Sequence, residues 1–590
     1  MSEIKKDIID VPVDEKVNPI EANDSADGSF KPLDSDKKEE TVSLTEDGDE
    51  ATMEDLKTLR HVSGKIPLRV WLVAIVELAE RFSYYGLSTP FQNYMQNGPE
   101  DTPKGLLKLG SQAATALSYF FQFWCYVTPI LGAYISDSYL GKYKTICMAC
   151  GIYIAGIFIL FMGSIPSITT RNAAIGTYVA AIIIIGIATG FIKSNVSPLI
   201  ADQIPKEKPT IRVLKSGERV VVDPAITIQN VFMIFYAMIN IGSFSIAATT
   251  QLEHRVGFWA AFLLPFCFFF VGVFALVIGK NQYVKLPVSD KIVAKCFKVA
   301  YIGIKNRFNL DSAKPSNNPE KNYNWTDHFV EEVKRATKAC KVFVFFIVFW
   351  TVYGQMTNNF VSMAGQMETH AMPNDMLQVF NSLAIVIAVP LCDRLIYPFI
   401  RRFTPLKSMT RIFIGFMFSA SAMVYAAVLQ HYIYKAGPCY DAPMACAPEY
   451  SNTPNRVHVA IQAPAYVLIG LSEIFANITG LEYAYTKAPI SMKAFVTSLY
   501  LLTTAFGSAI GIALASVSVD PKYVWLYTGL AVATFISGCI FWILFHHYND
   551  HEEELNQLEY DQTDNVAKDV FPGEGLAPIA SVSKSIRSVV

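Results

Sequence analysis

The chain has 590 residues, of which 52% are apolar and only 17% are charged. This balance favours a polytopic membrane protein over a large soluble multi-domain enzyme. The formal net charge of −2 conceals an uneven distribution, because residues 1–55 hold 18 acidic residues against 6 lysines and the remainder carries a net charge of +10. We therefore expect a lipid bilayer, and no nucleic acid, among the partners of the protein.

Both ends of the chain have compositions typical of disordered segments. Residues 1–65 are rich in Asp, Glu, Ser and Lys and nearly free of aromatic residues, and residues 547–590 repeat the pattern. Such segments cannot bury enough apolar surface to fold, so we predict two disordered cytosolic tails. Lysines such as Lys5 and Lys6 make the first tail a candidate for modification by the ubiquitin machinery.

Twelve apolar stretches lie between the tails, and at roughly 20 residues each is long enough to cross a hydrocarbon core about 30 Å thick. A polar connection at 281–338 separates six from six, which predicts an all-α membrane protein of two six-helix bundles, 66–280 and 339–546. We place the spans at 68–95, 112–136, 145–165, 173–200, 227–250, 257–280, 340–362, 372–396, 407–430, 459–485, 493–516 and 522–546.

The first span carries three charges in the stretch ELAERFSYYG. Charged side chains are costly inside a bilayer, so they need a reason to be there. At 100° per residue, Glu77, Glu80, Arg81, Tyr84 and Ser88 form one stripe, which must face the bundle interior or water. The alternative is an intrahelical pair of Glu77 and Arg81 that only offsets its own charge.

Polar residues recur in later spans. Glu473 lies well inside the tenth span and has no long stem that could reach the membrane surface. Lys193 lies near the inner end of the fourth span, where it could instead extend its head group to the surface. Asn240 and Asn381 supply amide side chains, whose role could also be limited to hydrogen bonding between helices. Trp350 adds aromatic surface.

The connection after the second span reads GAYISDSYLGKYKT. It resembles the loop motif of the major facilitator superfamily at Gly132, Asp137, Gly141, Lys142 and Thr145. In that family the motif has a structural gating role, so these residues are not expected to touch substrate. The resemblance implies the major facilitator fold, in agreement with two six-helix bundles.

Orientation follows from the basic residues between the spans. Connections on the side of the tails, such as SYLGKYKT and YPFIRRFTPLKS, are rich in Lys and Arg, whereas GSIPSITTRN and VSVD are poor in them. The positive-inside rule then places both termini in the cytosol. Cys439 and Cys446 share a loop on the other side of the membrane, which is oxidising. A disulfide between them is one hypothesis, and the alternative is that the two thiols are not linked.

Four segments in order and spacing, ELAERFSYYG, GFIKSNVSPLIADQ, FYAMINIGS and SEIFANITGLEYAYTKAPISMKA, resemble the proton-coupled oligopeptide transporter family, and most of all its fungal di- and tripeptide permeases. The resemblance covers about 65–546. It implies uptake of di- and tripeptides across the plasma membrane, driven by the proton gradient through alternating access.

The resemblance also implies roles for the charged and amide side chains in the spans. Arg81 and Lys193 would hold the peptide carboxylate, and Glu473, helped by Asn240 and Asn381, would hold the amino end. A dipeptide is a zwitterion at neutral pH, so charges of opposite sign at two ends of a site suit its backbone.

Three aromatic residues match family positions that line the cavity: Tyr85, Tyr126 and Trp350. Their flat apolar faces would accept many peptide side chains. Thr504 stands where relatives often place a serine, which puts that substrate contact in doubt.

Proton coupling needs a group that binds and releases a proton as the cavity opens and closes. Glu77 and Glu80 are the candidates, with Arg81, Lys193 and Glu473 as their charged partners. We expect protons as the coupling ion and no cofactor. There is no GxxxxGK[ST] loop for ATP, and the CxxC that ends at Cys150 in an apolar helix does not predict a metal site.

Three other classes of protein are alternatives. A transporter of nitrate or another small anion could share the fold, but an anion needs no carboxylate to hold an ammonium group. A peptide-sensing receptor could signal through long tails without net transport. An enzyme is not expected, because the spans hold no nucleophile with a base and no metal cluster.

Overall fold

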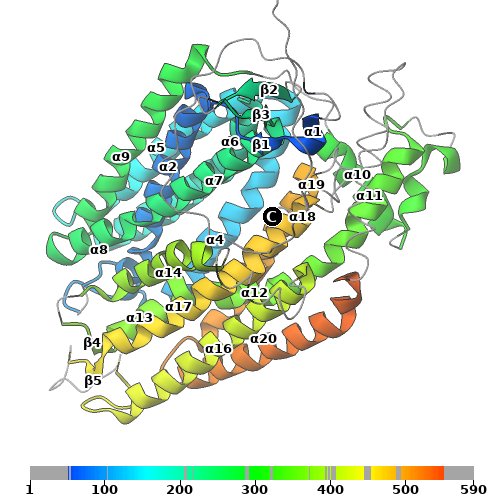
Figure 1. Ribbon diagram of the computed structural model, residues 1–590. Coiled ribbons are helices and arrows are strands. Elements are labelled where there is room, and N and C mark those ends of the chain that lie inside the picture. The colour runs from blue at the N-terminus through cyan, green and yellow to red at the C-terminus, as the bar shows by residue number, and fades with distance from the viewer. Residues whose placement is uncertain are drawn as a thin grey trace, which may run out of the picture.

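The computed structural model has two helical bundles, with the helices of the first half of the chain at the upper left of Figure 1 and those of the second half at the lower right. It describes residue 51 and residues 55–549 except 102–103, 205–208, 215–216, 286–291, 308, 319, 321–322, 371, 393–394, 396–398, 400–406, 444–452 and 487–492.

The first bundle consists of long helices, three of them extended by a shorter helical segment. Its elements are α2 (Leu68–Ser88), α3 (Phe91–Gln96), α4 (Gly110–Ile135), the π-helix η1 (Ser136–Leu140), α5 (Lys142–Gly163), α6 (Arg171–Asp202), α7 (Pro224–Ser243), α8 (Ser245–Arg255) and α9 (Phe258–Ile278).

The second bundle contains more interrupted helices. Its elements are η5 (Lys341–Phe345), α12 (Phe346–Tyr353), η6 (Gly354–Thr357), α13 (Asn359–Gly365), η7 (Asn374–Gln378), α14 (Val379–Leu391), α16 (Ser408–Lys435), η10 (Val459–Gln462), α17 (Ala463–Ser472), the π-helix η11 (Glu473–Ile478), α18 (Thr479–Thr486), α19 (Lys493–Leu514), η13 (Ala515–Val517), α20 (Tyr523–Phe545) and η14 (His546–Asn549).

Among the described residues, helices lie at all twelve predicted spans. Within the described residues, 10 helical segments are long and apolar enough by themselves to span a bilayer. One of the other two crossings is formed by α2 together with α3, and the second is formed by α4. Polar residues lower the hydropathy of both crossings. The charged residues Glu77, Glu80 and Arg81 of α2 are buried, and α2 packs against α7 and α9, whereas α4 packs against α6 and α19. The apolar side chains on other faces pack into separate clusters within each half of the chain.

The bundles have a tail-side end and, opposite it, a distal end. The tail-side end holds the start of α2 and the end of α6, and the distal end holds the connections 164–170 and 366–373. A short parallel pair of strands, β4 (Met367–Glu368) and β5 (Asn455–His458), lies at the distal end, at the lower left of Figure 1.

The end of the predicted disordered tail is ordered, so the prediction of disorder for 1–65 is wrong at its boundary. Residues Asp55–Thr58 form α1, and β1 (Arg60–Val62) joins a three-stranded sheet with β3 (Arg219–Val222) and β2 (Thr210–Val213). β1 is parallel to β3, whereas β2 is antiparallel to it. The pairing is with a connection that lies more than 140 residues away, so local composition could not reveal it.

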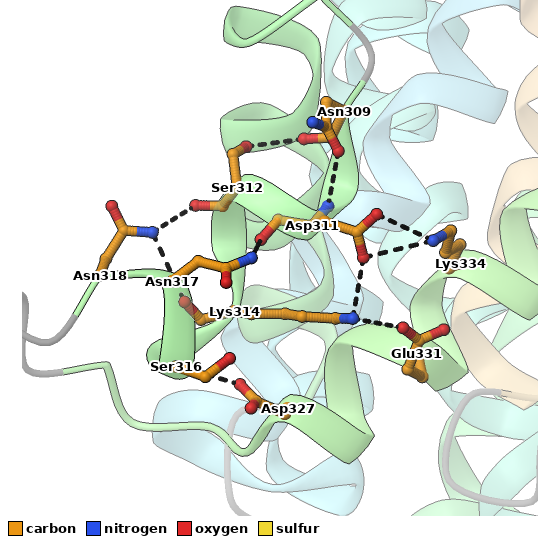
Figure 2. A network of polar contacts seen from close by, with 10 residues as sticks. All are labelled: Asn309, Asp311, Ser312, Lys314, Ser316, Asn317, Asn318, Asp327, Glu331 and Lys334. Atoms are coloured by element: carbon orange, nitrogen blue, oxygen red, sulfur yellow. Dashed lines mark hydrogen bonds and ion pairs between the residues drawn. The ribbon is translucent and has the colours of Figure 1, made fainter.

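The connection between the bundles also has structure. It contains two helices, α10 (Ile292–Lys305) and α11 (Asp327–Cys340). A polar network joins the turn after α10 to α11 (Figure 2). Asp311 accepts from Lys314 at 2.9 Å and from Lys334 at 2.9 Å, and these two cations lower the pKa of the Asp311 carboxyl.

Candidate functional site

A cavity lies between the two bundles near the middle of the helices. It is lined from α2, α4 and α7 on one side and from η6, η7, α14 and η11 on the other. Six predicted site residues are among its lining: Arg81, Tyr85, Tyr126, Asn240, Asn381 and Glu473. The structure therefore brings together side chains that are up to 392 positions apart in the sequence.

The charged stripe of α2 forms one wall of this cavity. Arg81 is only 5% exposed, and its Nε lies 3.0 Å from Glu77 Oε1 and 2.6 Å from Glu80 Oε2. Both glutamates are buried and are not among the cavity-lining residues. One guanidinium thus contacts two carboxylates, and the intrahelical pair with Glu77 is only part of a larger cluster.

Lys193 on α6 lies next to this cluster. Its ammonium group lies 3.6 Å from the centre of the Tyr126 ring. This is a cation–π contact, in which the face of an aromatic ring attracts a cation. It is also within electrostatic range of Glu77, Glu80 and Arg81. Lys193 is half-buried beside the cavity rather than among its lining residues, and its side chain is directed into the bundle instead of to the membrane surface.

Glu473 supplies the opposite charge from the second bundle. It is the first residue of the π-helix η11, and one-turn π segments are frequent at functional sites because they redirect side chains. Asn477 donates to Glu473 Oε1 at 3.3 Å, and the side chains of Tyr353 and Asn381 also face its carboxyl. Its Oε2 is buried and has no hydrogen-bond partner among the described residues.

Of the other predicted side chains, one lines the cavity and two are buried behind its lining. Asn240 lines the cavity but donates to the backbone oxygen of Tyr236 on its own helix at 2.8 Å. Trp350 is buried behind the lining and makes an edge contact with Tyr353 at 5.3 Å between ring centres. Thr504 is fully buried and is likewise not a lining residue.

Several lining residues were not predicted. Tyr236, Tyr353 and Gln378 all line the cavity. Tyr236 could have been found, because it lies four positions before Asn240 and therefore on the same helical face. Gln378 lies in the turn η7, where no helical periodicity identifies the inward face.

The loop motif lies at the tail-side end of the first bundle. Asp137 is in the π-helix η1, and Gly141 has a φ of +75°, a left-handed conformation that favours glycine. Lys142 forms a salt bridge with Asp202 at the end of α6. Gly132 lets α4 approach α6, because an added Cβ would come within 2.7 Å of the Phe191 Cα.

The distal loop with the two cysteines is partly described. Cys439 is disulfide-bonded, as the hypothesis requires. Its predicted partner, Cys446, lies outside the described residues, as do the tail lysines Lys5 and Lys6. The nearby backbone is held by Asn455, which accepts from the Cys439 N–H at 2.9 Å.

Two six-helix bundles around a charged central cavity define a membrane transporter of the major facilitator fold. The chain belongs to the POT family, whose model (PTR2) matches residues 143–532. This match confirms the resemblance seen in the sequence motifs.

Similar proteins agree over most of the chain. A relative from Candidozyma auris named peptide transporter PTR_A is 63% identical over 92% of this chain and 91% of its own length. The peptide transporter PTR2 of Saccharomyces cerevisiae is 62% identical over 88% of this chain and 86% of its own. The crystal structure of the POT family transporter PepTSo superposes with a TM-score of 0.65 at 19% identity, covering 82% of this chain and 99% of that one.

Proposed function

We propose that the protein is a proton-coupled symporter that imports di- and tripeptides across the plasma membrane by alternating access, with both termini in the cytosol. The names of relatives that are 62% and 63% identical support peptide as the substrate class. The basic connections on the tail side support a cytosolic location for the tails. In this orientation the distal end faces the outside.

The observation that carries the proposal is the placement of opposite charges on opposite bundles. Arg81 faces the cavity from the first bundle and Glu473 faces it from the second. A zwitterionic peptide can present its carboxylate to Arg81, with Lys193 nearby, and its ammonium group to Glu473. Binding then links the two bundles through one molecule, which is what a transporter needs to couple occupancy to closure.

The surface between these charges suits variable side chains. Tyr85, Tyr126, Tyr236 and Tyr353 line the cavity and provide aromatic faces with one polar atom each. Aromatic faces bind apolar groups without demanding one shape, and the hydroxyls can bind polar groups. The charged residues therefore bind the amino and carboxyl ends that all peptides share, and the aromatic surface accepts the variable side chains.

The shared guanidinium supports the proposal of proton coupling. Arg81 contacts Glu77 and Glu80 at once, so these two carboxylates depend on Arg81 and on the nearby Lys193 for their counter-charge. A peptide carboxylate that draws Arg81 towards the cavity would leave a glutamate in need of a proton. The proton gradient supplies about 1.4 kcal/mol per pH unit, and the membrane potential adds about 2.3 kcal/mol per 100 mV for each charge.

Reconstitution into liposomes tests the proposal. With an acidic exterior, we expect labelled dipeptide to accumulate inside, and neither nitrate nor free amino acid to do so. A proton ionophore should abolish the accumulation. Uptake of nitrate instead would favour an anion transporter, and peptide binding without any uptake would favour a receptor.

Glu473→Gln should lower uptake of a dipeptide with a free amino end by roughly tenfold to a hundredfold, because a charge-assisted hydrogen bond worth about 1.5–3 kcal/mol is lost. An N-acetylated dipeptide has no ammonium group, so its weaker uptake should change little. The ratio of the two uptake rates is the measurement. An equal loss for both peptides would contradict the role of Glu473 in binding the amino end.

A further inference from the structure

A layer of polar side chains joins the bundles at the distal end. Asn93 of α3 and Asn374 of η7 exchange two amide hydrogen bonds, at 2.8 and 2.9 Å. Gln92 donates to Ser362 at 3.2 Å, and Ser111 donates to the Ser518 backbone oxygen at 2.8 Å. These hydrogen bonds hold the two bundles together at the distal end, so this end is closed.

Two carboxyl groups meet inside this layer, one from each bundle. Glu253 of α8 and Asp375 of η7 face each other, because α8 packs against η7 and Asn93 donates both to Glu253 and to Asn374, the residue before Asp375. Asp375 is 0% exposed, and Glu253 Oε2 is inaccessible although the residue as a whole is half-buried. Asn93 donates to the other oxygen, Glu253 Oε1, at 2.9 Å. A direct contact of two buried carboxyls holds only when one of them carries a proton.

The groups around the pair do not replace that proton. The backbone N–H groups of Asp375 and Met376 face the Asp375 carboxyl, and α3 contributes the neutral Asn93. Tyr466 of α17 is fully buried, lies within electrostatic range of Asp375 and has a hydroxyl without a hydrogen-bond partner. In the part of the chain that the structure describes, no ion pair of Lys, Arg or His involves either carboxyl.

We propose that Glu253 and Asp375 form a second proton-binding site, separate from the cluster around Arg81, and that the proton they share holds the distal end closed. With the proton, a hydrogen bond links the bundles. Without it, two adjacent carboxylates repel each other and favour separation of the bundles. The closed distal end is therefore stable at acidic pH and weakens as the pH rises.

In the proposed orientation, this site is nearest to the outside. An acidic exterior would load the pair and close the outer end, which is the direction that proton-driven import requires. The inference rests on the proposed function only for that orientation. The conformational equilibrium itself can be measured without peptide, so a failure of peptide transport would leave it standing.

The test measures the spacing of the bundles at the distal end. Spin labels are placed at Ile168 and Lys522, exposed residues of the first and second bundle, in full-length protein in which the exposed Cys267 is replaced by serine. Distances are recorded without peptide at a series of pH values from acidic to alkaline. The variants are Glu253→Gln and Asp375→Asn.

The wild-type protein should show a longer-distance population that grows with pH. Either amide variant can donate a hydrogen bond without a proton, so that population should fall by roughly tenfold at the highest pH and lose its pH dependence. Glu368→Gln, which changes an exposed carboxyl at the same end, should behave like the wild type.

Wild-type distances that do not respond to pH would overturn the proposal. So would a Glu253→Gln or Asp375→Asn variant that keeps the full wild-type response. The two variants provide independent tests if one does not fold. Failure of both to fold would also count against the proposal, because an amide should satisfy this hydrogen bond as well as a shared proton does.

Discussion

Replacing Arg81 with alanine should reduce peptide uptake by roughly 30-fold to several thousandfold, because truncating one member of a buried charge contact costs about 2–5 kcal/mol. Arg81 is buried, faces the cavity and is the cation that contacts both Glu77 and Glu80. Its removal takes away a partner of the peptide carboxylate and leaves two carboxyls without their nearest counter-charge. Initial rates of labelled dipeptide uptake in liposomes measure the effect.

Arg81→Lys separates charge from shape. A lysine keeps the positive charge but lacks the planar fork that can contact two carboxylates, so an intermediate loss is expected. Arg60→Ala is the matched control, because Arg60 is an exposed arginine whose partner, Glu218, is also exposed. Uptake by Arg81→Ala within about threefold of the wild type would show that the peptide carboxylate is held elsewhere.

The double variant Glu77→Gln, Glu80→Gln should lose proton-driven accumulation while it retains part of its peptide exchange. Glutamine has nearly the shape of glutamate but cannot bind and release a proton. Glu80, which is 0% exposed and closest to Arg81, should account for the larger share. The measurements are accumulation under an imposed pH gradient and counterflow between equal peptide pools without one.

The single variants show how the two glutamates divide this work. If only one carries the coupling proton, its glutamine variant alone should reproduce the double variant. Glu218→Gln, at an exposed glutamate of the same chain, is the control for loss of a carboxylate as such. Normal pH-dependent accumulation by the double variant would remove both residues from the coupling mechanism.

Helical geometry made much of the site predictable. The spacing of Glu77, Glu80 and Arg81 places them on one face, and the cost of charge in a bilayer directs that face inward. The same cost identified Glu473 in the second bundle. These are strong constraints, because few arrangements make a buried charge tolerable, and the structure places all four residues in or beside one cavity.

Partners from distant segments were not predictable. Nothing in the sequence indicates that Lys142 pairs with Asp202 or that Glu253 meets Asp375, since each pair is formed only by the packing of separate helices. The interrupted helices of the second bundle hide further positions. Tyr353 stands at the junction of α12 and η6, where the change of helical type alters which residues face inward.

The sheet at the tail-side end sets a practical boundary for shortening the chain. Deleting the residues that precede Asp55 leaves its contact with Arg219 and the whole of β1 in place. A deletion that continues to residue 65 would remove β1 from its pairing with β3 and would take His61 away from Asp223, 2.9 Å away. Experiments that assign regulatory effects to the acidic tail should therefore cut before Asp55, so that any change in activity reflects the tail and not the loss of a strand.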